Sequence, residues 1–272
     1  MEQLDIPAAE TYFRTAHQLA GTGRGSSHAQ RLAGATLGDL LYEQGNIADA
    51  DRLLDASHEL GPEGGGVDFM LATYGTGARI KVLLGDLEAA DERLREAAEI
   101  AETLSLPRMA ARIENERIRA GLVNARYGRQ EQAAEGQLDG IAVITSELQS
   151  DSTVRLLLKN PATKQIDLAV TLAAELLRQA EQCGRPRAAL RARLLLVCAQ
   201  TTMGDVAGAV CTLIPAIITC AEKGLVRAVL DAGPRIGDAL DALTEELSAG
   251  EWPEGWSSAA STFLASLPGR PS

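Results

Sequence analysis

The glycine run Gly64 to Gly66, followed closely by Asp68, is the part of this sequence that most resembles a phosphate-binding loop. Such a loop holds phosphate with backbone N–H groups, but it follows a β-strand and precedes a Lys-Ser/Thr pair or a helix opened by G-x-G-x-x-G. Here the preceding residues have a helical pattern, and the next lysine is Lys81. We therefore predict that GPEGGG, residues 61–66, and GTGRGSS, residues 21–27, are joints between helices.

Histidine and cysteine side chains could bind a metal or act as nucleophiles, but their spacing favours neither role. The residues concerned are His17, His28, His58, Cys183, Cys198, Cys211 and Cys220. None lies at the spacing of a C-x-x-C or H-E-x-x-H site, so we predict solvated histidines and buried thiols of a reducing compartment. The sequence contains no catalytic motif that we recognise, and we expect no enzymatic activity, no metal and no cofactor.

Six polar residues interrupt apolar helical stretches and are candidates for contact with a ligand. They are Asp68, Tyr74, Arg79, Arg112, Asn115 and Arg119. Asp68 lies 17 residues before Gly85 and Arg112 lies 16 before Gly128, so we expect similar heights on neighbouring helices. One hypothesis is a polar patch on a groove that recognises a ligand or peptide. The alternative is a set of inter-repeat salt bridges and solvated surface, each exposed pair contributing about 0 to 1 kcal/mol.

A repeat with a period of about 40 residues must position these side chains. Four segments align without gaps and share Gly, a polar residue and, five residues after the Gly, Ala: GNIADADRLL, GDLEAADERL, GRQEQAAEGQ and GDVAGAVCTL, which begin at positions 45, 85, 128 and 204. Two more keep only the second half of the pattern, IPAAETYF from Ile6 and IDLAVTLA from Ile166.

The residue types explain the repeat as a helical hairpin. We predict that the Gly ends one helix in a left-handed conformation, that the polar residue caps the next, and that the Ala lies where the two helices cross. The low aromatic content of 3% and the apolar content of 46% also favour closely packed Ala- and Leu-rich helices. The predicted fold is all-α, a right-handed superhelical solenoid of about six tetratricopeptide-like hairpins.

We predict a single superhelical domain over residues 1–272, with irregular repeats at both ends. Residues 1–22 form a partial first repeat, and its unpaired apolar face could support a homodimer. Residues 224–272 form capping helices, kinked at Pro234, in which Trp252, Trp256 and Phe263 cover the last core face. Acidic residues such as Glu92, Glu96 and Glu99 are expected on a solubilising convex face, or as a site for a basic protein segment.

Charge and hydropathy restrict the partners. The formal net charge of −11 argues against a nucleic-acid surface, which needs clustered Lys and Arg. The N-terminal residues lack the basic and apolar order of a signal peptide, and we find no run of about 20 apolar residues. We expect a cytoplasmic protein without nucleic-acid or membrane partners.

Several segments are similar to a known family. LGDLLYEQGNIADADRLL, the RLLL after Thr153 and RAVLDAGP from Arg227 resemble the tetratricopeptide-like superhelical region of MalT-type ATP-dependent regulators. GPEGGGVDF, GARIKVLLGD and IENERIRAGL resemble the C-terminal region of PknK-type serine/threonine kinases, which share that superhelix. The resemblance implies a sensor or partner-binding arm of a larger signalling protein, separate from its kinase, nucleotide-binding or DNA-binding parts.

Two functions are compatible with these features. The first is a non-catalytic regulatory module that docks a protein partner or other domains of its own parent chain. The second is a small-molecule sensor that binds an inducer in the concave groove, which would shift the superhelix between two states.

Overall fold

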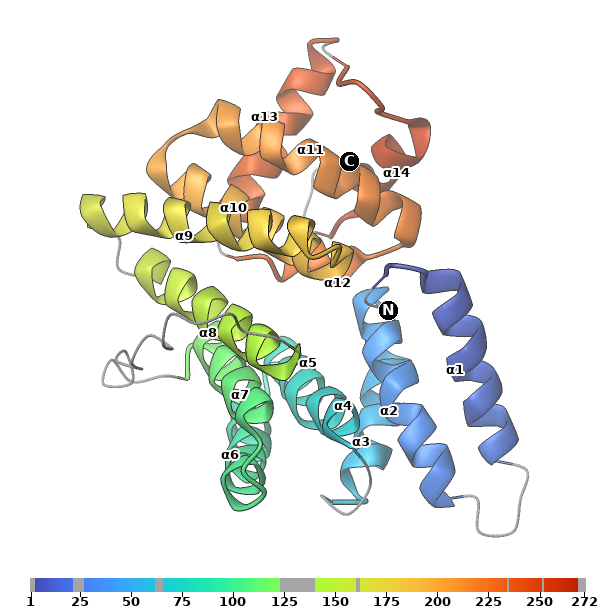
Figure 1. The fold of residues 1–272 in the computed structure, drawn as a ribbon. Helices are drawn as coiled ribbons and strands as arrows, with labels where there is room; N and C mark the ends of the chain where they lie inside the picture. The colour runs from blue at the N-terminus through green and yellow to red at the C-terminus, as the bar shows by residue number, and fades with distance from the viewer. Residues whose placement is uncertain are drawn as a thin grey trace. The chain divides into compact units, whose positions relative to one another are not determined.

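The computed structural model describes residues 3–21, 27–61, 66–122, 140–159, 162–233, 235–250 and 252–268, which form helices and no strand (Figure 1). The helices are α1 (Ile6–Ala20), α2 (Ser27–Glu43), α3 (Ile47–His58), α4 (Val67–Met70), α5 (Gly77–Leu83), α6 (Leu87–Thr103), α7 (Pro107–Ala120), α8 (Gly140–Lys159), α9 (Thr163–Gln182), α10 (Pro186–Met203), α11 (Val206–Lys223), α12 (Val226–Leu230), α13 (Ile236–Ser248) and α14 (Ser258–Ser266). The predicted all-α, helical-repeat fold is confirmed.

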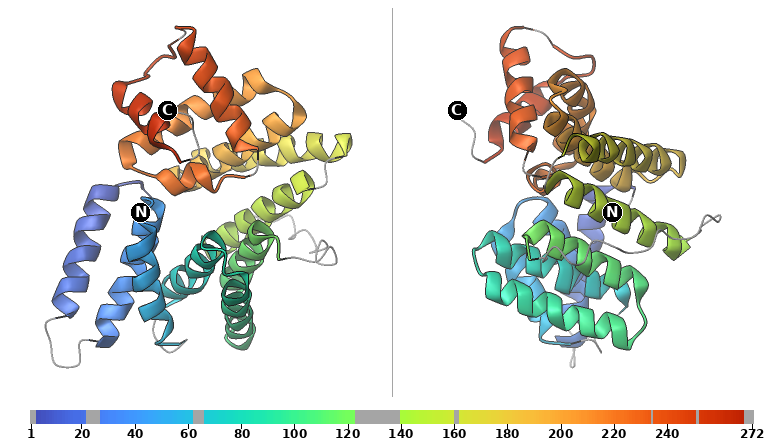
Figure 2. Two further views of the ribbon diagram at one scale, coloured as in Figure 1. Left: turned by 180° about the vertical axis from the view of Figure 1, so that it is seen from behind. Right: turned by 90° about the vertical axis from the view of Figure 1, so that its left-hand side faces the viewer.

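Contacts between residues divide the chain into two compact units. The N-terminal unit comprises Ile6–Ser152, and the C-terminal unit comprises Thr153–Ser272 together with Met1–Asp5. In the N-terminal unit α1 packs on α2, α2 on α3, α5 on α6 and α6 on α7 (Figures 1 and 2). In the C-terminal unit α9 packs on α10 and α10 on α11, and α13 and α14 pack on α11. The expectation of one continuous domain stays a prediction.

The hairpin turns have the predicted chemistry at three of the four aligned glycines. Gly45, Gly85 and Gly204 have φ angles of 85°, 83° and 89°, in the left-handed region where only glycine is unstrained. The next residue caps the following helix in each case. The Asp86 carboxylate, for example, accepts a hydrogen bond of 3.0 Å from the backbone N–H of Ala89. The turn predicted at Gly128 lies outside the described residues.

The repeat alanine is buried wherever the structure describes it. Ala50, Ala90, Ala169 and Ala209 have no exposed surface, and Ala9 is 8% exposed. A methyl side chain at this position lets the two helices of a hairpin approach closely. The one-Ala-per-repeat pattern is thus a packing requirement of the hairpin.

Loss of one of these caps should have a measurable cost. Replacing Asp86 by alanine removes the acceptor for Ala89 N–H and is expected to lower the free energy of unfolding by about 1 kcal/mol. Urea denaturation followed by circular dichroism would measure this. Glu102→Ala, on the exposed end of the same helix, is the matched control and should change the free energy by less than about 0.5 kcal/mol. Equal losses in the two variants would contradict the capping role.

The helix expected to run from Val67 to Leu84 is interrupted. Its central part, Leu71–Thr76, is a π-helical turn between α4 and α5. The glycines in this stretch, Gly75 and Gly77, accommodate arginine side chains from neighbouring helices. Regular α-helical geometry was the wrong prediction for this segment.

Three helix ends also differ from the sequence-based expectation. The helix from Pro107 was expected to continue to Tyr127, but α7 ends at Ala120 because Gly121 adopts a left-handed cap with φ of 75°. The helix from Leu225 was expected to be one kinked helix, but α12 ends at Leu230 and α13 begins only at Ile236. Pro234 itself lies outside the described residues.

The predicted aromatic cover of the last core face is partly wrong. Phe263 is buried, and the indole N–H of Trp256 donates to Ser261 Oγ over 2.9 Å. Trp252 is 63% exposed and covers no core. At the other end, Tyr12 and Leu19 of α1 are 72% and 68% exposed, so this helix does present apolar surface.

Candidate functional site

A buried carboxylate surrounded by arginines is the main polar feature of the N-terminal unit. Glu116 of α7 is only 3% exposed. Arg79 of α5 donates from Nε to Glu116 Oε2 over 3.0 Å and from Nη2 to Oε1. Arg112 and Arg119 lie one turn before and after Glu116, with Nε atoms 2.7 and 4.0 Å from its oxygens. The cluster therefore ties α5 to α7 through a single carboxylate.

The arginines keep Glu116 ionised despite its burial. Burial alone would raise the pKa of Glu116 because the charged form loses its water. The positive charges of Arg112, Arg79 and Arg119 outweigh this and lower the pKa to about 2. Glu116 is therefore a carboxylate at neutral pH and balances part of the local positive charge.

The same cluster extends to α8. Asn115 is 2% exposed, and its Nδ2 donates to Asp151 over 2.5 Å and to Ser152 Oγ over 3.0 Å. Arg119 Nη1 lies 4.0 Å from Asp151. Four of the six predicted patch residues, Arg79, Arg112, Asn115 and Arg119, thus gather around Glu116 and Asp151. We call this set the Glu116 cluster.

Asp68 does not belong to the Glu116 cluster. Its exposed carboxylate accepts a hydrogen bond of 2.6 Å from Arg108, one turn before Arg112. The expected pairing of heights was counted from Gly128, but α7 ends at Ala120, with Gly121 as its cap. Counting residues back from Gly128 therefore gave the wrong height for Arg112 of α7 relative to Asp68 of α4.

Tyr74 does not belong to the Glu116 cluster either. It lies on the side of the π-helical turn that faces α3 and α6. It has no exposed surface, and its hydroxyl donates to Glu96 Oε1 over 3.2 Å. The other Glu96 oxygen lies 2.8 Å from His58 Nε2, and the His58 and Tyr74 rings meet edge to face. Burial, and then the Glu96 carboxylate, raise the pKa of Tyr74, so the phenol stays protonated. His58 was predicted as solvated helix surface and Glu96 as part of an acidic solubilising face. Their side chains are 29% and 38% exposed and bind each other, so both are only partly solvated.

A second polar network links α3, α5 and α6. Lys81 Nζ donates to Asp51 and Asp55, each over 2.7 Å, and Arg93 Nη2 donates to Asp55 over 2.6 Å. Burial alone would raise the pKa of Asp55, but the hydrogen bonds from Lys81 and Arg93 hold it below its usual value. Arg93 is buried against Gly77, the first residue of α5.

Glu116, the centre of the first cluster, was not among the residues predicted from the sequence. One signal was present: Arg112, Glu116 and Arg119 are spaced i, i+4 and i+7, which places them on one face of a helix. No helical spacing in the sequence links Arg93 and Asp55. The two residues are 38 positions apart and meet only through tertiary packing.

The cysteines divide into two classes. Cys198 and Cys220 are buried, as predicted, whereas Cys183 and Cys211 are exposed, contrary to prediction. All four lie in the described part of the chain, and none of them forms a disulfide. Among the described residues, no group of three or more His, Cys, Asp or Glu side chains could hold a metal ion.

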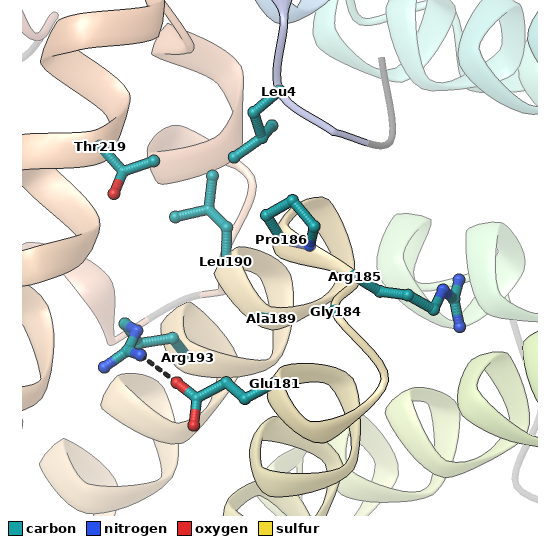
Figure 3. A pocket seen from close by; sticks show the side chains of 9 residues that line it. All are labelled: Leu4, Glu181, Gly184, Arg185, Pro186, Ala189, Leu190, Arg193 and Thr219. Atoms are coloured by element: carbon teal, nitrogen blue, oxygen red, sulfur yellow. Dashed lines mark hydrogen bonds and ion pairs between the residues drawn. The ribbon is translucent and has the colours of Figure 1, made fainter.

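The C-terminal unit contains a partly open cavity of about 320 Å³ (Figure 3). Leu4, Pro186, Ala189 and Leu190 supply its apolar wall, and Thr219 of α11 stands opposite. Its remaining lining residues are Glu181, Gly184, Arg185 and Arg193. Arg193 forms an ion pair with Glu181. This cavity combines aliphatic surface with a charged edge.

One described helix, α11, is long and apolar enough to cross a membrane on length and composition alone. It carries Pro215 inside, and it packs against α10, α13 and α14 in the C-terminal unit. A core helix passes the same test, so this observation is weak evidence for a membrane span.

Comparison with known proteins identifies the family to which this helical repeat belongs. The family described as the MalT-like TPR region matches residues 1–246. The chain belongs to this family. It is 42% identical over 234 residues, 85% of its length, to the serine/threonine-protein kinase PknK of Mycobacterium tuberculosis (strain H37Rv). The same identity and coverage hold for PknK of Mycobacterium bovis.

The chain spans about a fifth of the length of these relatives, since the matched part covers 21% of each. It therefore corresponds to a TPR-like part of a kinase homologue, which is consistent with a regulatory or docking module. No solved structure gives a significant match. The predicted resemblance to MalT-type and PknK-type proteins is confirmed.

Proposed function

We propose that this chain is a non-catalytic regulatory module that docks a protein partner, in the first instance the catalytic part of a kinase of its own family. The observation that carries the proposal is the match of a stack of helical hairpins to a fifth of proteins named serine/threonine kinases. Stacked hairpins offer extended surfaces that suit macromolecular partners. The polar groups of the Glu116 cluster bind mainly one another, which favours a rigid scaffold.

Calorimetric titration of this chain with the recombinant catalytic region of the Mycobacterium tuberculosis relative tests the proposal. We expect saturable binding of one chain per catalytic region. Because the chain carries a formal charge of −11, the titration should be repeated at high salt, where surface attraction is screened. Heat release that disappears entirely at high salt would indicate non-specific attraction and would contradict specific docking.

A small-molecule sensor is the second candidate, and the cavity of the C-terminal unit favours it. Its volume of about 320 Å³ lies at the lower end of the range for ligand pockets. A thermal-shift screen with sugars, nucleotides and acyl compounds tests this function. A ligand present at 100 times its dissociation constant would add about 2.7 kcal/mol to the free energy of unfolding. A saturable shift, without binding of the catalytic region, would favour the sensor over the docking module.

A further inference from the structure

Leu4 has a backbone conformation that a leucine adopts only when its surroundings hold it there. Its φ angle is 55°, in the left-handed region that is unfavourable for residues with a Cβ atom. Its side chain is only 5% exposed. The burial of this side chain therefore offsets the unfavourable backbone, and the surface that receives it binds an aliphatic group.

That surface is formed by two helices of the C-terminal unit. Figure 3 shows the Leu4 side chain pointing toward Leu190 of α10, with Pro186 beside it and Thr219 of α11 opposite. The Thr219 hydroxyl donates to the Pro215 carbonyl over 2.9 Å. We call the cavity lined by these residues the Leu4 socket.

The socket is larger than its present content requires. A volume of about 320 Å³ remains open with Leu4 in place. Space of this size beside an aliphatic contact can accept further side chains of a bound segment. The socket therefore has room for an occupant larger than one leucine.

Charge at the edge of the socket indicates the rest of the occupant. Arg193 lies at this edge and forms an ion pair with Glu181, whereas the Arg185 side chain points away from Leu190 (Figure 3). Glu181 is about half exposed, so a carboxylate from a bound segment can replace it at Arg193. In this chain Leu4 is followed by Asp5, which combines the aliphatic and acidic groups in one short segment.

We propose that the Leu4 socket is a docking site for an extended peptide segment of a protein partner, with an aliphatic anchor next to an acidic residue. Residues 3–5 of this chain are the internal competitor, because they place a leucine of the same kind in the socket. The inference rests on the proposed docking function and names the partner chemistry for one site. An extended peptide fits better than a compact metabolite because Gln3–Asp5, the segment that carries Leu4, is not helical.

The test measures binding of a fluorescein-labelled peptide, MEQLDI, by fluorescence anisotropy to the full chain and to its Leu4→Ala variant. A tethered competitor acts at an effective concentration of roughly millimolar, so the wild-type chain should bind the peptide weakly. The variant has lost the competing leucine and should bind at least about ten-fold more tightly. A variant peptide, MEQADI, should bind at least about ten-fold more weakly than MEQLDI, and Arg193→Ala in the Leu4→Ala background should also weaken binding.

Two results would overturn the proposal: no saturable binding of MEQLDI to the Leu4→Ala chain, or equal binding of MEQLDI and MEQADI. A metabolite that shifts the melting temperature and is displaced by neither peptide would also overturn it, in favour of a small ligand. If circular dichroism shows that Leu4→Ala is unfolded, the chain without residues 1–5 replaces it. Binding of the kinase catalytic region is measured separately, so intact binding there with no peptide binding would reject this site and leave the docking function standing.

Discussion

Replacing Glu116 by alanine is expected to lower the free energy of unfolding of the N-terminal unit by about 3 to 5 kcal/mol. The substitution removes the carboxylate shared by Arg79 and Arg112, whose side chains are only 14% and 12% exposed. Breaking a buried ion pair on one side leaves charges that have lost both their partner and their water. Urea denaturation followed by circular dichroism would show the loss as a shift of the transition midpoint.

A surface ion pair of the same chemistry is the matched control. Glu99 lies 3.3 Å from Arg95, and the two side chains are 67% and 58% exposed. Because water and salt screen this pair, Glu99→Ala should cost less than about 1 kcal/mol. Similar costs for Glu116→Ala and Glu99→Ala would contradict a structural role for the Glu116 cluster.

The pH dependence of stability gives the Glu116 prediction a second measurement. The pKa of Glu116 falls from 4.5 to about 2 on folding, so its contribution is fully present above pH 4.5 and is lost as the pH falls toward 2. The contribution is roughly 3 kcal/mol. The difference in stability between the wild-type chain and Glu116→Gln should therefore shrink over this window. A difference that is constant from pH 6 to pH 2.5 would show that the charge of Glu116 contributes little.

The hairpin fold could be predicted from the sequence because its determinants are local. A left-handed glycine, a capping Asp or Asn and a buried Ala five residues after the Gly occur within one short segment, as at Gly85, Asp86 and Ala90. None of these features depends on which other helix lies nearby. The repeat pattern can therefore be recognised from these short segments alone.

The candidate site was only partly predictable because it depends on the register between helices. Four of the six predicted residues do gather, yet the carboxylate at their centre, Glu116, was missed. Register depends on where each helix ends, and α7 ends at Ala120, earlier than the repeat count suggested. Exposure of Trp252 and partial burial of His58 likewise follow from which helix packs opposite, and this cannot be deduced from spacing within one helix.

Replacing Gly77 by alanine is expected to destabilise the N-terminal unit by about 1 to 3 kcal/mol. After Glu116→Ala, this is the second-largest effect on stability that we expect. In most helices the same change stabilises by up to about 1 kcal/mol, because alanine has the higher helix propensity. Here a Cβ atom on Gly77 would lie 2.2 Å from Nη1 of Arg93 and 3.2 Å from its Cζ. The guanidinium would have to move away from Asp55, to which it donates over 2.6 Å, and such overpacking carries this cost.

The sign of the effect separates this steric mechanism from helix propensity. Gly237→Ala in α13 is the control, because its Cβ would meet nothing within 4 Å, and it should leave stability unchanged or increase it. In an Arg93→Ala background the obstacle is gone while Lys81 still binds Asp55, so Gly77→Ala should there become stabilising. The double-mutant cycle measures this coupling as a reversal of sign. If Gly77→Ala destabilised equally with and without Arg93, the requirement for glycine would lie in the backbone of the adjoining π-helical turn and not in the buried arginine.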